Sequence, residues 1–244
     1  MRVLFVSPYF RPYLGGIERA IEELARELLT SREIESVGVL TTKYAFPRIP
    51  MTHLPNYEVT SDGISIFRIN SVPRAAPPFY SVPLVWFSPG QLNRHLKFFD
   101  PDIIHWVGDG WFWGHILTRL ATKAKIIFTP SFHSLSLSRQ WLRPINGILC
   151  RLVDKVVTLS SIESKLIQKA YWIRDDKMTT VGWGIRLPTN CKPRISKSMV
   201  RILCVGRLGN HKGQRWLIEV YRRAKSRFKY LTNLILIGRD EGEE

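Results

Sequence analysis

The chain has 244 residues, 45% of them hydrophobic and 23% charged, which is enough apolar material for a packed core and excludes an intrinsically disordered chain. Its formal net charge of +16 predicts an anionic partner, and charge alone leaves open nucleic acid, acidic lipid headgroups and phosphorylated small molecules. The three cysteines are an odd number without metal-ligand spacing, which argues against a disulfide framework or a zinc site and fits a reducing cytosol.

Short runs rich in β-branched residues recur along the chain, with helical or loop segments between them. The predicted strands are residues 3–7, 37–41, 64–69, 102–107, 125–129, 155–159, 200–205 and 233–237. Continuous apolar runs, in contrast to alternating ones, are typical of strands that are buried on both faces. They predict an α/β protein with a mostly parallel sheet.

Three helices are predicted between these strands. Residues 17–29 place apolar side chains at three- and four-residue steps and follow a double glycine. Residues 161–170 form the second helix, with Ser160 or Ser161 capping its first turn, and residues 216–226 form the third.

Residues 187–199 contain two prolines and no periodicity, which predicts a linker between two domains. The first domain would span residues 1–186. The second would begin at residue 200 and reach 244 with only strand, loop, helix and strand. One helix and two strands cannot build a covered doubly wound sheet, so we expect an incomplete second domain.

Two glycine-containing loops are candidates for anion binding. Gly15 and Gly16 lie between the first strand and its helix, where backbone amides can face an anion, although a plain turn accounts for them equally well. Arg207 and Lys212 lie in a second strand-to-helix loop, where a guanidinium and an ammonium group would suit a diphosphate. A basic surface loop is the alternative interpretation there.

Taken together and in order, several motifs resemble group 1 (family 4) glycosyltransferases. The motifs are residues 15–16 (GG), 101–105 (PDIIH), 132–134 (FHS), 154–160 (DKVVTLS) and 205–208 (VGRL), followed by Lys212 and Gly213. The resemblance covers essentially the whole chain. It implies the GT-B architecture of two Rossmann-like domains, the first receiving the acceptor and the second holding the nucleotide sugar.

The resemblance also implies roles for individual residues. Arg207 and Lys212 would bind the donor diphosphate, and the loop at Gly15 and Gly16 would close over it. His133 would be the catalytic candidate, placed near the transferred sugar to hydrogen-bond a hydroxyl or stabilise positive charge. His105 and Glu18 are further candidates for the cleft. His105 lies inside a predicted strand, where a hydrogen-bonded core histidine is the competing interpretation.

The implied reaction uses a UDP- or GDP-sugar as substrate, needs no cofactor or metal, and retains the anomeric configuration of the donor. The acceptor would be a glycan or a lipid-linked molecule. The family's later pair of glutamates, seven residues apart, has no match here. We therefore expect either a retaining glycosyltransferase truncated in its donor domain, or a non-catalytic remnant or subunit. The latter would retain acceptor or membrane binding and work with a polypeptide that supplies the missing half.

The remaining features bear on partners and location. Asp100 and Asp102 flank a proline, as in a metal-binding triplet, and we interpret them as structural residues at a turn. The basic density between residues 192 and 231 fits either an anionic membrane surface or a solvated face. No nucleic-acid-binding motif accompanies it. No apolar stretch approaches the roughly 20 residues of a membrane span, so the expected location is the cytoplasm, with peripheral attachment to the inner face of the membrane as a further expectation.

Overall fold

The computed structural model describes residues 1–13, 15–45, 49–74, 84–108, 112–130, 143–184, 187, 199–209 and 212–238. The chain divides into two compact units, Met1–Arg186 and Leu187–Glu244, and each is described by itself. Apart from Leu187 and Met199, the predicted linker lies outside the described residues.

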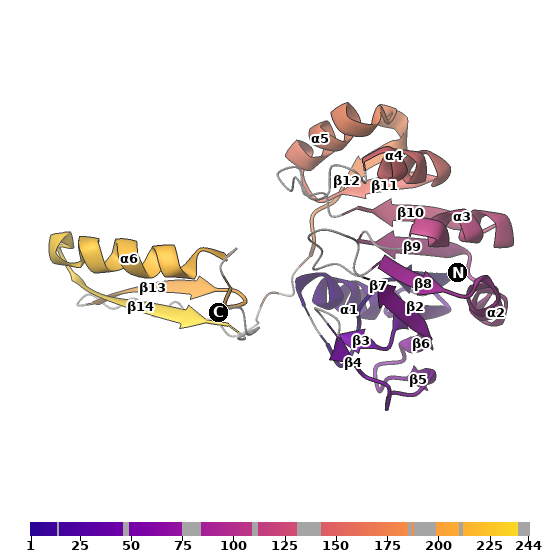
Figure 1. Ribbon diagram of the computed structural model, residues 1–244, viewed down its shortest axis with the longest axis horizontal. Coiled ribbons are helices and arrows are strands. Elements are labelled where there is room, and N and C mark those ends of the chain that lie inside the picture. Colours follow the sequence, from indigo (N-terminus) through magenta and orange to yellow (C-terminus); the bar gives the residue numbers. More distant parts are fainter. Residues whose placement is uncertain are drawn as a thin grey trace. The chain divides into compact units, whose positions relative to one another are not determined.

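The first unit is built on a large, mostly parallel sheet, which has eight strands among the described residues (Figure 1). Their spatial order is β12 (Met178–Thr180), β11 (Lys155–Thr158), β10 (Lys125–Thr129), β9 (Ile103–Val107), β1 (Arg2–Val6), β2 (Ser36–Thr42), β6 (Ser65–Ile69) and β5 (Tyr57–Val59). Neighbouring strands are parallel except for the β5–β6 pair at one edge. The predicted α/β class is confirmed.

The strand order reverses at one point. From β1 the chain proceeds outward to β2 and β6, and it later returns to β9 beside β1 before proceeding to β10, β11 and β12 in the other direction. Open parallel sheets bind ligands outside the carboxyl ends of their strands at such a switch point. A ligand site is therefore expected at the loops that follow β1 and β9.

Helices cover both faces of this sheet. The elements are α1 (Gly16–Leu29), α2 (Pro89–Phe99), α3 (Phe112–Ala121), α4 (Arg143–Leu152) and α5 (Ser161–Tyr171). Successive strand residues point to opposite faces. Val3 and Phe5 of β1 accordingly lie in the cluster with α1, while Leu4 and Val6 lie in the cluster with α2, α4 and α5.

The cap predicted for the second helix is present at α5. The Ser160 hydroxyl accepts a hydrogen bond from the backbone N–H of Glu163 at 3.1 Å. The carboxylate of Glu163 in turn accepts one from the backbone N–H of Leu159 at 2.5 Å. The bond to Ser160 occupies a donor that a helix start otherwise leaves unsatisfied. A short 3₁₀ turn, η2 (Asp175–Lys177), leads on to β12.

Two short antiparallel pairs lie outside the main sheet: β3 (Tyr44–Ala45) with β4 (Ile49–Pro50), and β7 (Ser71–Arg74) with β8 (Leu84–Phe87). The sequence patterns did not predict them. None of the helices within the described ranges has the length and apolar character that a membrane crossing requires.

The second unit consists, in its described part, of β13 (Met199–Val205), α6 (Gln214–Ala224), a 3₁₀ turn η4 (Lys225–Arg227) and β14 (Leu231–Ile237). The two strands are parallel and in register, with Val205 opposite Ile237. The Tyr221 hydroxyl donates to the carbonyl of Thr232 at 2.8 Å and fastens α6 to β14. Leu203, Val205 and Ile237 are 57%, 70% and 53% exposed, so one face of this parallel pair is uncovered.

Candidate functional site

The loop after β1 reaches the switch point and carries the predicted glycine pair. Its start is anchored to the next strand, because the Ser7 N–H donates to the Leu40 carbonyl at 3.1 Å and the Thr42 hydroxyl donates to the Pro8 carbonyl at 2.7 Å. Gly15 is the N-cap of α1 without a side-chain cap, and Gly16 is its first residue. The structure thus places both glycines at a helix N-terminus.

The two glycines differ in the space beside them. A Cβ built on Gly15 would lie 2.5 Å from Glu18 Oε2 and 3.3 Å from the Tyr13 hydroxyl. A Cβ built on Gly16 would meet nothing within 4 Å. Gly16 therefore offers an open backbone for close approach of a ligand, whereas the space at Gly15 is already occupied by the buried carboxylate of Glu18.

A charged network that the sequence analysis missed holds the loop in place. The guanidinium of Arg11 pairs with Glu22 of α1 and lies 3.2 Å from Asp62 Oδ2. Arg26 of α1 binds the same Asp62 oxygen through Nε at 2.6 Å. Burial opposes ionisation of Asp62, but hydrogen bonds from Thr60 and Arg26 outweigh it and lower the pKa of this carboxyl well below its usual range. The loop is therefore fixed to α1 and to the turn before β6.

Arg68 of β6 also binds the loop after β1. Its side chain is 1% exposed and pairs with Glu58. Its Nη2 donates to the carbonyl of Arg11 at 3.0 Å, and its Nη1 donates to that of Pro55 at 3.2 Å. A buried guanidinium of this kind is tolerated because two carbonyls and a carboxylate accept hydrogen bonds from its Nη1 and Nη2 atoms. Residues 11, 22 and 62 have no local pattern that would reveal the network in the sequence.

His105 is a core residue of β9, the strand between β1 and β10. Its Nε2 lies 2.8 Å from the Thr129 hydroxyl of β10, and its ring lies 5.4 Å from that of Phe5 in β1. Burial lowers the pKa of His105 to about 4, so the imidazole is neutral at pH 7. These contacts agree with the core interpretation of His105, whose imidazole does not change its protonation state near neutral pH.

His133, the catalytic candidate, lies outside the described residues, and its role stays a prediction. Asp100 and Asp102, the residues of the metal-like triplet, both bind Arg2. Asp100 accepts from the Arg2 guanidinium at 2.5 Å and Asp102 from the Arg2 N–H at 2.6 Å. Within the described part of the chain no three His, Cys, Asp or Glu side chains gather as metal ligands.

The second candidate loop connects β13 to α6. The Gly206 N–H donates to the carbonyl of Ile237 at 2.9 Å, and Gln214 Nε2 donates to the carbonyl of Arg207 at 2.7 Å. Gly213 caps α6 with a φ of 74°, a conformation that glycine adopts without strain. Gly238 is required as well, because a Cβ there would overlap the carbonyl oxygen of Gly206.

The first turn of α6, all of it described, contains no acidic residue, and its cap has no side chain to bind the free N–H groups. This helix end is therefore electropositive, with Arg207 partly exposed and Lys212 exposed before it. The first turn of α1 instead contains Glu18. Of the two predicted anion sites, the loop before α6 has the more favourable charge.

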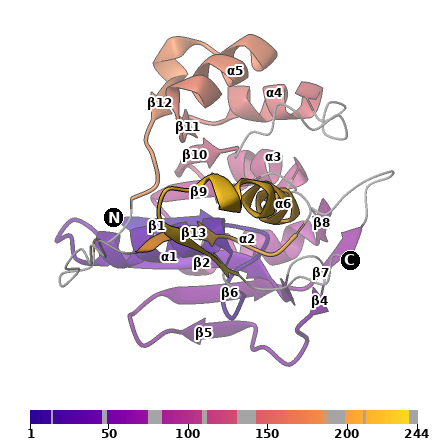
Figure 2. The same ribbon diagram turned by 90° about the vertical axis from the view of Figure 1, so that its left-hand side faces the viewer.

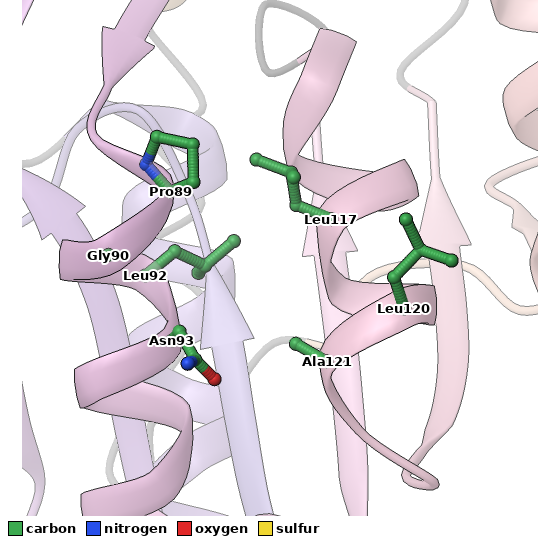
Figure 3. A pocket seen from close by; sticks show the side chains of 7 residues that line it. All are labelled: Pro89, Gly90, Leu92, Asn93, Leu117, Leu120 and Ala121. Carbon is green, nitrogen blue, oxygen red and sulfur yellow. The ribbon is translucent and has the colours of Figure 1, made fainter.

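An open groove of about 480 Å³ lies between α2 and α3 (Figure 3). It is lined by Pro89, Gly90, Leu92, Asn93, Leu117, Leu120 and Ala121. These side chains are mostly aliphatic, and none belongs to a strand or to the loops that follow β1 and β9. The groove is therefore separate from the switch point.

Comparison with known proteins identifies relatives of this chain. The model of the family described as Glycosyltransferase Family 4 matches residues 14–187. A GDP-mannose:cellobiosyl-diphosphopolyprenol alpha-mannosyltransferase from Komagataeibacter xylinus is 27% identical over 251 residues. That alignment covers 98% of this chain, which spans only 58% of the relative's length.

Solved structures share the fold at low sequence identity. The apo form of the lipopolysaccharide outer core galactosyltransferase WaaB matches with a TM-score of 0.61 at 16% identity, over 99% of this chain and 62% of that one. A glycosyltransferase from Rickettsia africae matches with a TM-score of 0.57 at 16% identity, over 98% of this chain and 68% of that one. The expected GT-B fold class is confirmed.

Proposed function

This chain belongs to glycosyltransferase family 4, and on that basis we propose that it serves the transfer of a sugar from a nucleotide sugar to a lipid-linked glycan. The observation that carries the proposal is the electropositive loop before α6, where Arg207 and Lys212 precede a helix N-terminus without an acidic residue. A diphosphate is the anion that matches two cations and a row of backbone N–H groups.

In this proposal, the loop before α6 stabilises the diphosphate as it leaves. The bond between the anomeric carbon and the donor phosphate breaks with its electrons on the phosphate oxygen. An acceptor hydroxyl forms its new bond to the same face of the sugar and passes its proton to that oxygen, so the configuration is retained. Charge stabilisation of the leaving group is the main catalytic term. His133 would stabilise the positive charge that develops on the sugar.

The first unit would receive the acceptor at the switch point of its sheet. Support comes from the open backbone at Gly16 and from the charged network that fixes its loop. A lipid-linked acceptor would place the protein at a membrane surface as a peripheral protein.

The named activity of the Komagataeibacter xylinus relative guides the choice of substrates. That protein is named for GDP-mannose as donor and a diphosphopolyprenol-linked disaccharide as acceptor. We therefore propose a GDP-sugar as the first donor class to test, with UDP-sugars as the second.

A subunit role is the second candidate function, and a specific observation favours it. The uncovered face that includes Leu203, Val205 and Ile237 is one that a parallel sheet normally buries. A separate polypeptide that covers this face would complete the donor site. The chain would then be inactive alone and active in the complex.

Product analysis by mass spectrometry tests the function. The full chain is incubated with cellobiose linked to a polyprenyl diphosphate and, in turn, with GDP-mannose, UDP-glucose and UDP-galactose. We expect a product that carries one further hexose with one of these donors, and a slower reaction with the Arg207→Ala variant. If the chain binds the acceptor but forms product only after a second polypeptide is added, the subunit role holds. Failure to bind any of these donors or the acceptor contradicts both candidates.

A further inference from the structure

The outer face of α5 carries large apolar side chains. On its inner side, the helix packs Ile167 and Tyr171 into the core of the first unit. Ile162 and Leu166, one turn apart, and Trp172, directly after the helix, are 70%, 38% and 80% exposed. This spacing places Ile162 and Leu166 on one side of the helix, and Trp172 follows its last residue. A neighbouring helix, α4, lies beside α5 in both views (Figures 1 and 2) and exposes Ile148.

Trp172 has a backbone conformation that is unusual for a tryptophan. It ends α5 with φ 49° and ψ 50°, the left-handed region in which helices usually place glycine or asparagine. Its N–H donates to the Gln168 carbonyl at 2.9 Å, a bond that any residue except proline could make. Because the side chain is largely in solvent, packing does not offset the strain. The fold would be served better by a smaller residue at this position.

The same face is cationic. Lys165 and Lys169 are exposed on it, and no carboxylate of the described residues pairs with either. Glu163, the one acidic residue of α5, turns its carboxylate back to the N–H of Leu159. The exposed side of α5 therefore combines aliphatic side chains, a terminal tryptophan and two unopposed lysines. Helices that lie in the interface of an anionic bilayer have this composition.

Two other exposed apolar surfaces have a different composition. The groove between α2 and α3, where Leu120 is 80% exposed, has no aromatic side chain in its lining. The open face of β13 and β14 belongs to a parallel sheet, which a further layer of secondary structure would cover. Neither of these two surfaces joins a tryptophan to unopposed cations. Helix α6 exposes Trp216, but its Arg222 and Arg223 pair with Glu219.

We propose that the α5 face, defined as Ile162, Lys165, Leu166, Lys169 and Trp172, docks on the surface of a bilayer that contains anionic phospholipid. The aliphatic side chains enter the boundary between headgroups and acyl chains, Trp172 lies at the level of the headgroups, and the lysines pair with lipid phosphates. A net charge of +16 draws the chain to such a surface. Docking needs neither donor nor acceptor, so it can hold or fail independently of the proposed transfer reaction.

Co-sedimentation with vesicles tests the apolar part of the α5 face. The full chain and its Trp172→Asn variant are titrated with vesicles of phosphatidylglycerol and phosphatidylcholine. We expect the substitution to weaken binding about tenfold or more, as loss of a buried aromatic side chain should. Since asparagine tolerates the left-handed conformation, the melting temperature should stay equal or rise. The matched control is Leu120→Asn, which removes an equally exposed side chain from the groove between α2 and α3.

The charged part is tested with the Lys165→Gln/Lys169→Gln variant. At low salt, we expect about a fivefold loss of affinity for each lysine, and the control pair Lys97→Gln/Lys123→Gln should lose clearly less. Vesicles of pure phosphatidylcholine should bind the unmodified chain weakly. The proposal is overturned if the unmodified chain does not bind anionic vesicles, which is the result expected if the α5 face is a surface for a protein partner. It is also overturned if the control variants weaken binding as much as the α5 variants do.

Discussion

Removing the guanidinium of Arg207 should sharply weaken the binding of nucleoside diphosphates. The loop should survive the Arg207→Ala change, because its bond with Gln214 is made by the backbone carbonyl of residue 207. A hydrogen bond to a charged group contributes about 1.5–3 kcal/mol, which corresponds to a roughly 10- to 150-fold loss of affinity. Lys212 is exposed, and a solvent-exposed ion pair contributes at most about 1 kcal/mol, so Lys212→Ala should cost up to about fivefold.

Isothermal titration calorimetry with GDP and UDP measures both effects. Lys225→Ala is the matched control, because it removes one positive charge at the opposite end of α6. We expect its affinity to lie within about twofold of the unmodified chain, since charge interactions fall off beyond the Debye length of ~10 Å at 0.1 M salt. An Arg207→Ala variant that binds GDP as well as the unmodified chain refutes the assignment. If the Lys225→Ala variant loses as much affinity for GDP, the effect of Arg207 is only that of the net charge of the chain.

Three further predictions concern the first unit. Gly16→Ala has open space for its Cβ, so urea unfolding should show an unchanged or slightly higher stability, while acceptor binding in calorimetry falls if a ligand approaches this backbone. Gly114→Ala would push a methyl group into the Trp106 ring, and a melting experiment should report a loss of about 1–3 kcal/mol. His105 has a folded pKa of about 4, below its usual 6.5, so the unfolded state binds more protons between these values and stability falls as the pH drops from about 6.5 to 4. Denaturant titrations should show that His105→Phe flattens this dependence, and an unchanged slope contradicts the buried neutral state.

The sheet of the first unit was predictable from sequence because its central strands are buried on both faces. The predicted strand at residues 125–129, which has three apolar residues in a row, matches β10 residue for residue. The helix α1 was equally clear, since one face packs on the sheet and the other meets solvent. By contrast, β12 has exposed Thr179 and Thr180 at the edge of the sheet and shows no such run. Helix α2 begins with a proline and a glycine, which interrupt its pattern.

The candidate site was predictable only as far as it depends on local sequence. Glycines before helices and cations beside them can be read along the chain, and Gly15, Gly16 and Gly213 all lie at helix starts. The network of Arg11 could not be read, because its carboxylate partners are 11 and 51 residues away. Its geometry exists only once β6 and α1 are folded against each other.

The two helix N-termini differ in the charge of their first turns. A phosphate near Gly15 would meet the carboxylate of Glu18, and two negative charges at about 4 Å repel each other by about 4 kcal/mol in a partly buried setting. That exceeds the roughly 0.3–1 kcal/mol that a helix N-terminus offers an anion. A sugar hydroxyl meets no such penalty and can donate to the carboxylate.

The loop before α6 contains Arg207 and Lys212 with no acidic residue in the first turn that follows. These charges favour a diphosphate at α6 and a neutral, hydroxyl-bearing group at α1, so Glu18→Gln should strengthen phosphate binding at the first loop and weaken sugar binding there.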